Sequence, residues 1–184
     1  MSEVTAVPLR PIKKGVLPML WVGIAITLLL ALAAAWTSTS KAVAMAQTPA
    51  DFLAENGKRS GVVTTASGLQ YEVLKPGKGP KPTAGDVALI TYDGKLVSGE
   101  TFDSSAKNGG PVPMPVSGVI PGFSEALQLM QADGKYRFWI PPALGYGDRA
   151  AGPIPANSVL VFDVGLIGFQ PMPAGMPGMP GAGM

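Results

Sequence analysis

Residues 119–147 read VIPGFSEALQLMQADGKYRFWIPPALGYG, and this stretch contains the signals that decide the fold. The apolar residues of FSEALQLM (123–130) recur three and four positions apart, which predicts a helix with one apolar face. Tyr136–Ile140, rich in aromatic residues, is typical of a strand. The Pro-Pro and Gly-Tyr-Gly groups that follow it indicate a loop.

Three further segments on either side are typical of strands: LQYEVL (69–74), VALITY (87–92) and VLVFDVGLI (159–167). The stretch 75–85 contains three Pro and three Gly, so we expect a loop there. Strands and helices do not alternate as they do in a parallel sheet. We therefore predict an α+β domain over residues 62–170, with an antiparallel sheet and one short α-helix packed on its face.

The segment PVPMPV (111–116) has Pro at every second position. Because Pro has no backbone N–H to donate to a neighbouring strand, any strand here is expected to be irregular or to lie at an edge of the sheet.

The N-terminal part of the chain carries a long apolar run, LPMLWVGIAITLLLALAAAW (17–36), with no charged residue from Gly15 to Ser40. About 20 helical residues span the roughly 30 Å hydrocarbon core of a bilayer. Basic residues precede the run at positions 10, 13 and 14, and such residues stay on the cytoplasmic side. We therefore predict a cytoplasmic N-terminus (1–15), a single transmembrane helix (16–37) and export of the remainder.

A second interpretation of this segment stays open. The sequence Ala-Met-Ala at 44–46 resembles a signal peptidase site, although the apolar run is longer than a usual signal peptide core. The first interpretation places the protein in the inner membrane, as a single-pass protein with its folded domain in the periplasm. The second predicts a soluble periplasmic protein after cleavage at Ala46.

The two segments that flank the predicted domain are short. Residues 38–61 form a linker with a short helix, because Thr48 and Pro49 are typical of a helix start and Asn56-Gly57 of a helix end. Residues 171–184 (PMPAGMPGMPGAGM) contain only Pro, Met, Gly and Ala, a composition that predicts disorder. The alternative for this tail is a copper(I) site made by its Met thioethers.

The composition excludes several kinds of chemistry. The chain of 184 residues contains no Cys and no His, so it has no thiol nucleophile, no imidazole base and no Cys/His zinc site. We expect no metal and no cofactor in the domain. Residues 62–170 carry eight Lys and Arg against nine Asp and Glu, and this near-neutral charge argues against nucleic-acid binding.

The sequence also contains a set of short motifs whose common order along the chain indicates the family more specifically than any single motif does. They are TFDSS (101–105), VIPGF followed by EAL and LM (119–130), IPP followed by LGYG (140–147), and IP, NS and LVFDV (154–164). Together they resemble the FKBP-type peptidyl-prolyl cis–trans isomerases over about residues 62–169. The bacterial exported branch of that family is the most similar, since its members also carry sequence like FLAENGK and TTASGLQYEVL ahead of the domain.

The resemblance implies a twisted antiparallel sheet wrapped around one short helix, and a cavity that binds a prolyl residue. Carried over by motif, the catalytic positions are Tyr92, Phe102, Asp103, Ile120, Tyr146 and Phe162. The substrate-binding positions implied in the same way are Met114, Val119, Phe123 and Ile154. The implied partners are proline-containing polypeptides, and a macrolide inhibitor is a further implied ligand.

The resemblance also implies roles for single groups. The N–H of Ile120 and the O–H of Tyr146 would donate to carbonyls of the bound peptide, and Asp103 would orient Tyr92. The implied function is prolyl cis–trans isomerisation during folding of exported proteins. The alternative is a binding or chaperone module of the same fold with weak turnover.

Each implied residue also has a purely structural interpretation. Phe102 and Phe162 are equally typical of a core, and Asp103 before two Ser residues is typical of an Asx turn. The chain departs from the family pattern at Phe123, where Trp is common, and at Val112 and Met114, where aromatic residues are common. These departures bear on macrolide affinity and catalytic rate more than on the fold.

Overall fold

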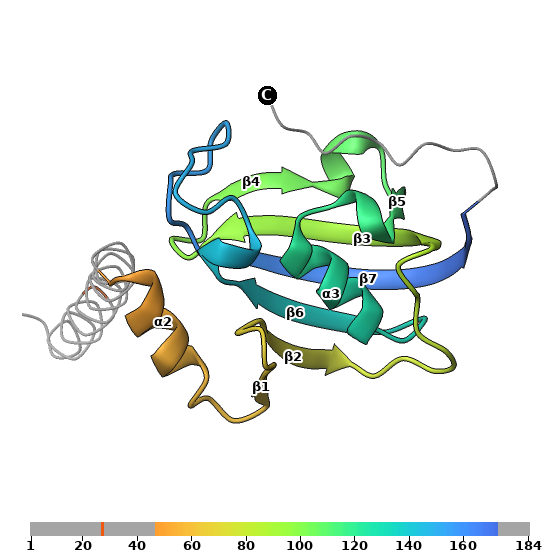
Figure 1. Ribbon diagram of the computed structural model, residues 1–184, viewed down its shortest axis with the longest axis horizontal. Coiled ribbons are helices and arrows are strands. Elements are labelled where there is room, and N and C mark those ends of the chain that lie inside the picture. The colour runs from red at the N-terminus through yellow and green to blue at the C-terminus, as the bar shows by residue number, and fades with distance from the viewer. Residues whose placement is uncertain (1–26, 28–46, 173–184) are drawn as a thin grey trace, which may run out of the picture. The chain divides into compact units, whose positions relative to one another are not determined.

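The computed structural model describes Thr27 and residues 47–172 of the chain. Seven strands lie in one sheet (Figure 1): β1 Val62–Thr64, β2 Gln70–Lys75, β3 Asp86–Leu96, β4 Thr101–Ser104, β5 Val112–Pro115, β6 Lys135–Ile140 and β7 Leu160–Pro171. Within residues 47–172, two α-helices accompany them, α2 Pro49–Asn56 and α3 Pro121–Leu129. Three short 3₁₀ turns complete the described elements: η1 Ser105–Asn108, η2 Val116–Gly118 and η3 Pro142–Leu144.

All strand pairs are antiparallel, in the order β1-β2-β6-β7-β3-β4. This confirms the predicted antiparallel sheet, and the strands expected at 69–74, 87–92, 136–140 and 159–167 are all present with shifted ends. The long strand β3 pairs with β7 on one side, and on the other with β5 along its first half and with β4 along its second half. The proline-rich strand β5 pairs only with β3 within residues 47–172, so the prediction of an edge strand is confirmed.

Helix α3 lies across one face of the sheet (Figure 1) and closes the main core. It begins at Pro121, whose missing N–H costs nothing in the first helical turn. The apolar positions predicted to face the sheet, Phe123, Ala126, Leu127 and Met130, are all buried. On the sheet, every second residue of β6 and β7 points toward the helix, as the pleat requires.

Helix α2 matches the prediction from the sequence, with Thr48 as its N-cap: the Thr48 side-chain oxygen accepts a hydrogen bond from the Asp51 N–H at 3.2 Å. The contacts of this helix extend beyond the linker region. Gln70 of β2 donates to the Leu53 carbonyl and accepts from the Asn56 amide, both at 2.8 Å. The amide side chains of Asn56 and Gln70 are both buried, so α2 is hydrogen-bonded to the sheet.

A further contact of the segment after α2 lies on the face of the sheet opposite α3. Trp139 points away from the main core and is only 3% exposed. The guanidinium of Arg59, just after α2, lies 5.4 Å from the centre of the Trp139 ring, which is within the range of a cation–π contact. The segment after α2 therefore covers part of the outer face of the sheet.

The predicted membrane segment (16–37) lies outside the described residues apart from Thr27, as does the predicted tail beyond Met172. Within the residues that the structure describes, none of the helices has the length and apolar character needed to cross a bilayer.

Candidate functional site

A cavity of about 690 Å³ opens between the start of α3, the strands β3, β4, β5 and β7, and the loop 141–159. All ten site residues predicted from the sequence line it: Tyr92, Phe102, Asp103, Met114, Val119, Ile120, Phe123, Tyr146, Ile154 and Phe162. The structure adds Gly118, Ala151 and Pro153. These three lie within three residues of predicted ones, so extending each motif along the chain would have found them.

Strand geometry explains why the side chains converge. Tyr92 on β3 and Phe162 on β7 belong to the alternate positions that face α3. Phe102 and Asp103 come from the short strand β4, which the sequence did not predict. Val119 and Ile120 lie at the entrance to α3, where the chain turns into the helix.

Four aromatic rings form the wall of the cavity, and three of them pack around Phe162. The ring centres of Phe123 and Phe162 are 4.8 Å apart with planes at 63°, and those of Phe102 and Phe162 are 5.5 Å apart at 83°. Tyr92 packs against both Phe123 and Phe162. These tilted and edge-on arrangements are the favoured ones for aromatic pairs. Phe123 is 4% exposed and is the most buried of the four rings.

This packing requires a glycine on β3. A Cβ atom at Gly94 would lie 2.8 Å from ring atoms of both Phe102 and Phe162. Real Cβ atoms do not approach aromatic carbons so closely, so any side chain at position 94 would push the two rings apart.

Tyr92 and Asp103 form a hydrogen-bonded pair at the wall of the cavity. The Tyr92 O–H donates to Asp103 Oδ2 at 2.6 Å, and Asp103 Oδ1 accepts from the Ser104 N–H at 2.8 Å. Burial, together with this hydrogen bond and the carboxylate charge, raises the pKa of Tyr92 to about 12. The phenol is protonated at neutral pH and, as the hydrogen-bond donor, holds the carboxylate in one orientation.

Two donors in the cavity are left open. Within residues 47–172, neither the Ile120 N–H nor the Tyr146 O–H has a hydrogen-bond acceptor in the protein. Ile120 is the N-cap of α3, so its carbonyl is used by Phe123 and Ser124 while its N–H remains available. Tyr146 is 37% exposed at the mouth of the cavity.

The loop that carries Tyr146 and Ile154 is held by its own backbone. Ala151 and Ile154 exchange two hydrogen bonds, at 2.9 and 3.0 Å. The Asn157 N–H donates to the Gly147 carbonyl at 2.8 Å and ties the end of the loop to its beginning. The positions of both cavity residues are therefore set by the loop itself.

This arrangement suits binding of an apolar group beside a peptide carbonyl. Its lining contains one carboxylate, two open donors and otherwise apolar or aromatic side chains. Within the described part of the chain, no three His, Cys, Asp or Glu side chains are grouped so as to hold a metal ion.

Known protein families match two neighbouring parts of the chain. A model of the family described as FKBP-type peptidyl-prolyl cis-trans isomerase matches residues 79–167. A model of the domain amino terminal to such isomerases matches residues 29–73. The crystal structure of FkpA from Escherichia coli superposes with a TM-score of 0.66 at 34% identity, covering 89% of this chain and 76% of that one. The chain belongs to the FKBP family.

Curated FKBP relatives are more similar in sequence. The chain is 48% identical over 120 residues to the FKBP-type isomerase FkpA of Aeromonas hydrophila, and this alignment covers 65% of this chain and 45% of that protein. It is 47% identical over 125 residues to the FKBP-type 22 kDa isomerase of Escherichia coli K12, covering 67% of this chain and 61% of that protein. The FKBP chain thus matches about half of the length of these relatives.

Proposed function

We propose that this FKBP chain is a peptidyl-prolyl cis–trans isomerase that acts on proline-containing segments of exported proteins. The observation that carries the proposal is the aromatic cavity, in which one oriented carboxylate and two open donors surround a space lined by Phe102, Phe123 and Phe162. The ten lining residues predicted by family resemblance support it as well.

The reaction requires no nucleophile and no proton transfer. The barrier to rotation about an X–Pro bond is about 18–20 kcal/mol and arises from amide resonance. Uncatalysed exchange takes tens of seconds or longer. When the bond twists, resonance is lost and the carbonyl becomes less polar. A dry aromatic cavity then favours the twisted form over the planar one, which is differential binding of the transition state.

In this proposal the polar groups position the substrate. The Ile120 N–H and the Tyr146 O–H donate to carbonyls that flank the proline, and the Asp103 carboxylate, held by Tyr92, faces the carbon of the twisting carbonyl. Phe123 lies under the pyrrolidine ring. A macrolide inhibitor occupies the same cavity, since it presents an apolar ring next to carbonyl acceptors.

The test is catalysis by the full-length chain purified in a mild detergent and shown to be folded by its thermal unfolding curve. We expect it to accelerate cis–trans exchange in an Ala-Leu-Pro-Phe peptide, measured by exchange NMR. A folded protein that binds the peptide without accelerating exchange would support the alternative, a proline-binding or chaperone module. A folded protein that neither binds nor accelerates would contradict both.

We further propose that the chain is a single-pass protein of the inner membrane with its FKBP domain in the periplasm. The uncharged run 17–36 and the basic residues before it support this proposal. The N-terminal residue of the mature protein tests it. Met1 or Ser2 is expected for a retained anchor, whereas Gln47 would indicate cleavage after Ala46 and a soluble periplasmic enzyme.

A further inference from the structure

One edge of β3 has a break in its pairing beside the cavity. Strand β5 pairs with Val87–Ile90, and the pairing with β4 begins only at Asp93. Tyr92 therefore lies where β3 has no neighbouring strand on that side. A buried backbone N–H at such a break needs another acceptor, because leaving it without one is costly.

Ser105 supplies this acceptor. The Tyr92 N–H donates to Ser105 Oγ at 3.1 Å, and Ser105 is only 5% exposed. Ser105 is also the first residue of the η1 turn, where its carbonyl accepts from the Gly110 N–H at 3.0 Å. The serine is thus fixed at both its side chain and its backbone.

Tyr92 is consequently held at two ends by one short segment. Asp103 accepts from the Tyr92 hydroxyl, and Ser105, two residues later, accepts from the Tyr92 backbone. The distance between the phenol and the carboxylate depends on how β4 and η1 lie against β3. The Ser105 hydroxyl is the side-chain link that fixes this placement at the point where strand pairing stops.

We propose that Ser105 is a positioning residue for the Tyr92–Asp103 pair. Its hydroxyl takes the place of the missing strand partner of Tyr92 and so fixes the position of the pair at the cavity wall. This inference rests on the proposed isomerase function, since it concerns the geometry of that site. Ser105 itself does not line the cavity. Its effect on turnover is therefore expected to pass through Tyr92.

The neighbouring Ser104 offers a matched control. Ser104 is half-buried on β4, and within the described residues its hydroxyl makes no hydrogen bond; only its backbone N–H and carbonyl are used. Replacing Ser104 by Ala therefore removes the same atom from the next position without touching Tyr92.

The experiment compares kcat and KM for the full-length parent, Ser105→Ala, Ser104→Ala, Tyr92→Phe and the double variant Ser105→Ala/Tyr92→Phe. We expect Ser105→Ala to lower kcat roughly tenfold with little change in KM, because small misplacement of a positioned group costs rate. Ser104→Ala is expected to stay close to the parent. In the Tyr92→Phe background, Ser105→Ala is expected to cost little further, because the hydroxyl that it places is already gone.

The outcomes separate cleanly. A parent that does not accelerate exchange would contradict the proposed function itself, before any variant is compared. If the parent is active, two results would overturn the positioning role and leave Ser105 as a structural residue. One is a kcat of Ser105→Ala equal to that of the parent. The other is a Ser105→Ala loss of kcat that is just as large in the Tyr92→Phe background. If Ser105→Ala is unfolded at the assay temperature, Ser105→Cys takes its place, and its weaker acceptor is expected to give a smaller loss of kcat that again disappears without the Tyr92 hydroxyl.

Discussion

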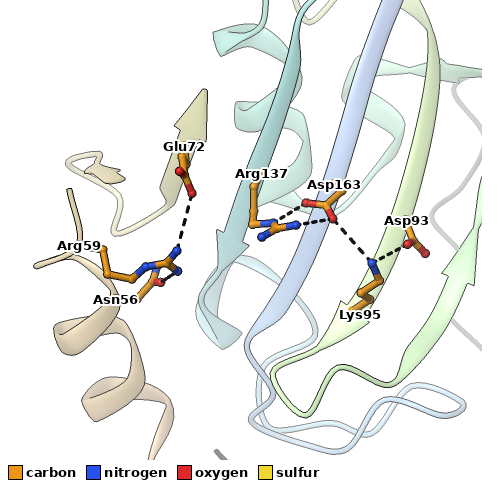
Figure 2. Close-up of polar contacts among 7 residues, drawn as sticks. All are labelled: Asn56, Arg59, Glu72, Asp93, Lys95, Arg137 and Asp163. Atoms are coloured by element: carbon orange, nitrogen blue, oxygen red, sulfur yellow. Dashed lines mark hydrogen bonds and ion pairs between the residues drawn. The ribbon is translucent and has the colours of Figure 1, made fainter. Parts of the chain in front are cut away.

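The two faces of the sheet use polar groups in opposite ways. On the face toward α3, β3 and β7 present Tyr92 and Phe162 to an aromatic cavity with a single carboxylate. On the outer face, the next residues of the same strands are charged, and Figure 2 shows them in a row of alternating sign across four strands: Asp93 and Lys95 on β3, Asp163 on β7, Arg137 on β6 and Glu72 on β2, with Arg59 beyond.

The charged side chains of the outer row form ion pairs with one another. Arg137 donates to both carboxylate oxygens of Asp163, at 2.5 and 2.8 Å, and Lys95 lies 3.7 Å from the same carboxylate. Burial alone would raise the pKa of Asp163, but the Arg137 guanidinium outweighs it and holds this pKa below its ordinary value. The cavity, in contrast, leaves donors open. The contrast teaches that variants on the inner face should change rate and variants on the outer face should change stability.

The largest effect is expected for Phe102→Ala. This ring forms one wall of the cavity and is only partly buried, so its loss should lower kcat/KM on the order of a hundredfold while the melting temperature falls by a few degrees. Peptide exchange kinetics and a thermal unfolding curve measure the two quantities, with the exposed neighbour Thr101→Ala as control. Proportionate losses of activity and stability would mean that Phe102 is a core residue.

A smaller loss of rate is expected for Asp103→Asn. The amide keeps the shape of the side chain but removes the charge that the Tyr92 hydroxyl orients. Since a charge-assisted hydrogen bond contributes about 1.5–3 kcal/mol, we expect kcat/KM to fall roughly tenfold or more. The matched change on the outer face, Asp93→Asn, should leave kcat/KM unchanged, and an equal loss there would contradict the division between the faces.

On the outer face, the strongest effect on stability is expected for Gln70→Ala. It leaves the Nδ2 of the buried Asn56 amide without its acceptor and removes one of the two donors to the Leu53 carbonyl, which keeps the Gly57 N–H. The free energy of unfolding should fall by about 2 kcal/mol. Urea unfolding measures this, with the half-buried neighbour Glu72→Gln expected to cost under about 0.5 kcal/mol. Below the melting range, kcat/KM should match that of the parent; a lower value would show that α2 affects the cavity.

The smallest effect is expected for Arg137→Gln, which should cost about 1 kcal/mol at neutral pH because the pair is partly exposed. The folded-state pKa of Asp163 is lowered, so the unfolded state binds its proton first as the pH falls. The contribution of the pair is therefore fully present above the ordinary Asp pKa of about 3.9 and is lost below it.

Unfolding of the parent and Arg137→Gln at a series of pH values from neutral to acidic should show the two curves converging in acid. The exposed neighbour Lys135→Gln is the control, since within the described residues it makes no ion pair. A difference that stayed constant into acid would mean that Asp163 does not carry the effect.

The elements that could be predicted from the sequence are those with a repeating apolar pattern. The spacing in 123–130 predicted α3 within two residues at its start and one at its end, and Thr48-Pro49 predicted the first turn of α2. Alternate prolines predicted that β5 would lie at an edge. Each of these signals is local, because helix spacing, helix capping and the missing N–H of Pro all act within a few residues of one another.

What the sequence left undetermined depends on distant partners. Strands β1 and β4 are three and four residues long, too short to show an alternating pattern. The buried Asn56–Gln70 pair joins residues 14 positions apart, and nothing in either polar residue indicates its burial. The cavity residues were found together because their motifs occur in a family order, whereas Ser105 needed the position of the break between β4 and β5.

The attachment of α2 to the sheet has a mechanical consequence. Tension applied to the chain ahead of Thr48 is first borne by the Asn56–Gln70 amides and by Arg59 against Trp139. From there the load passes into β2 and β6, whereas the cavity strands β7, β3 and β4 come later in the order of the sheet. We therefore expect a pull from the N-terminal side to break the contacts at this end of the sheet before it distorts the rings around Phe162.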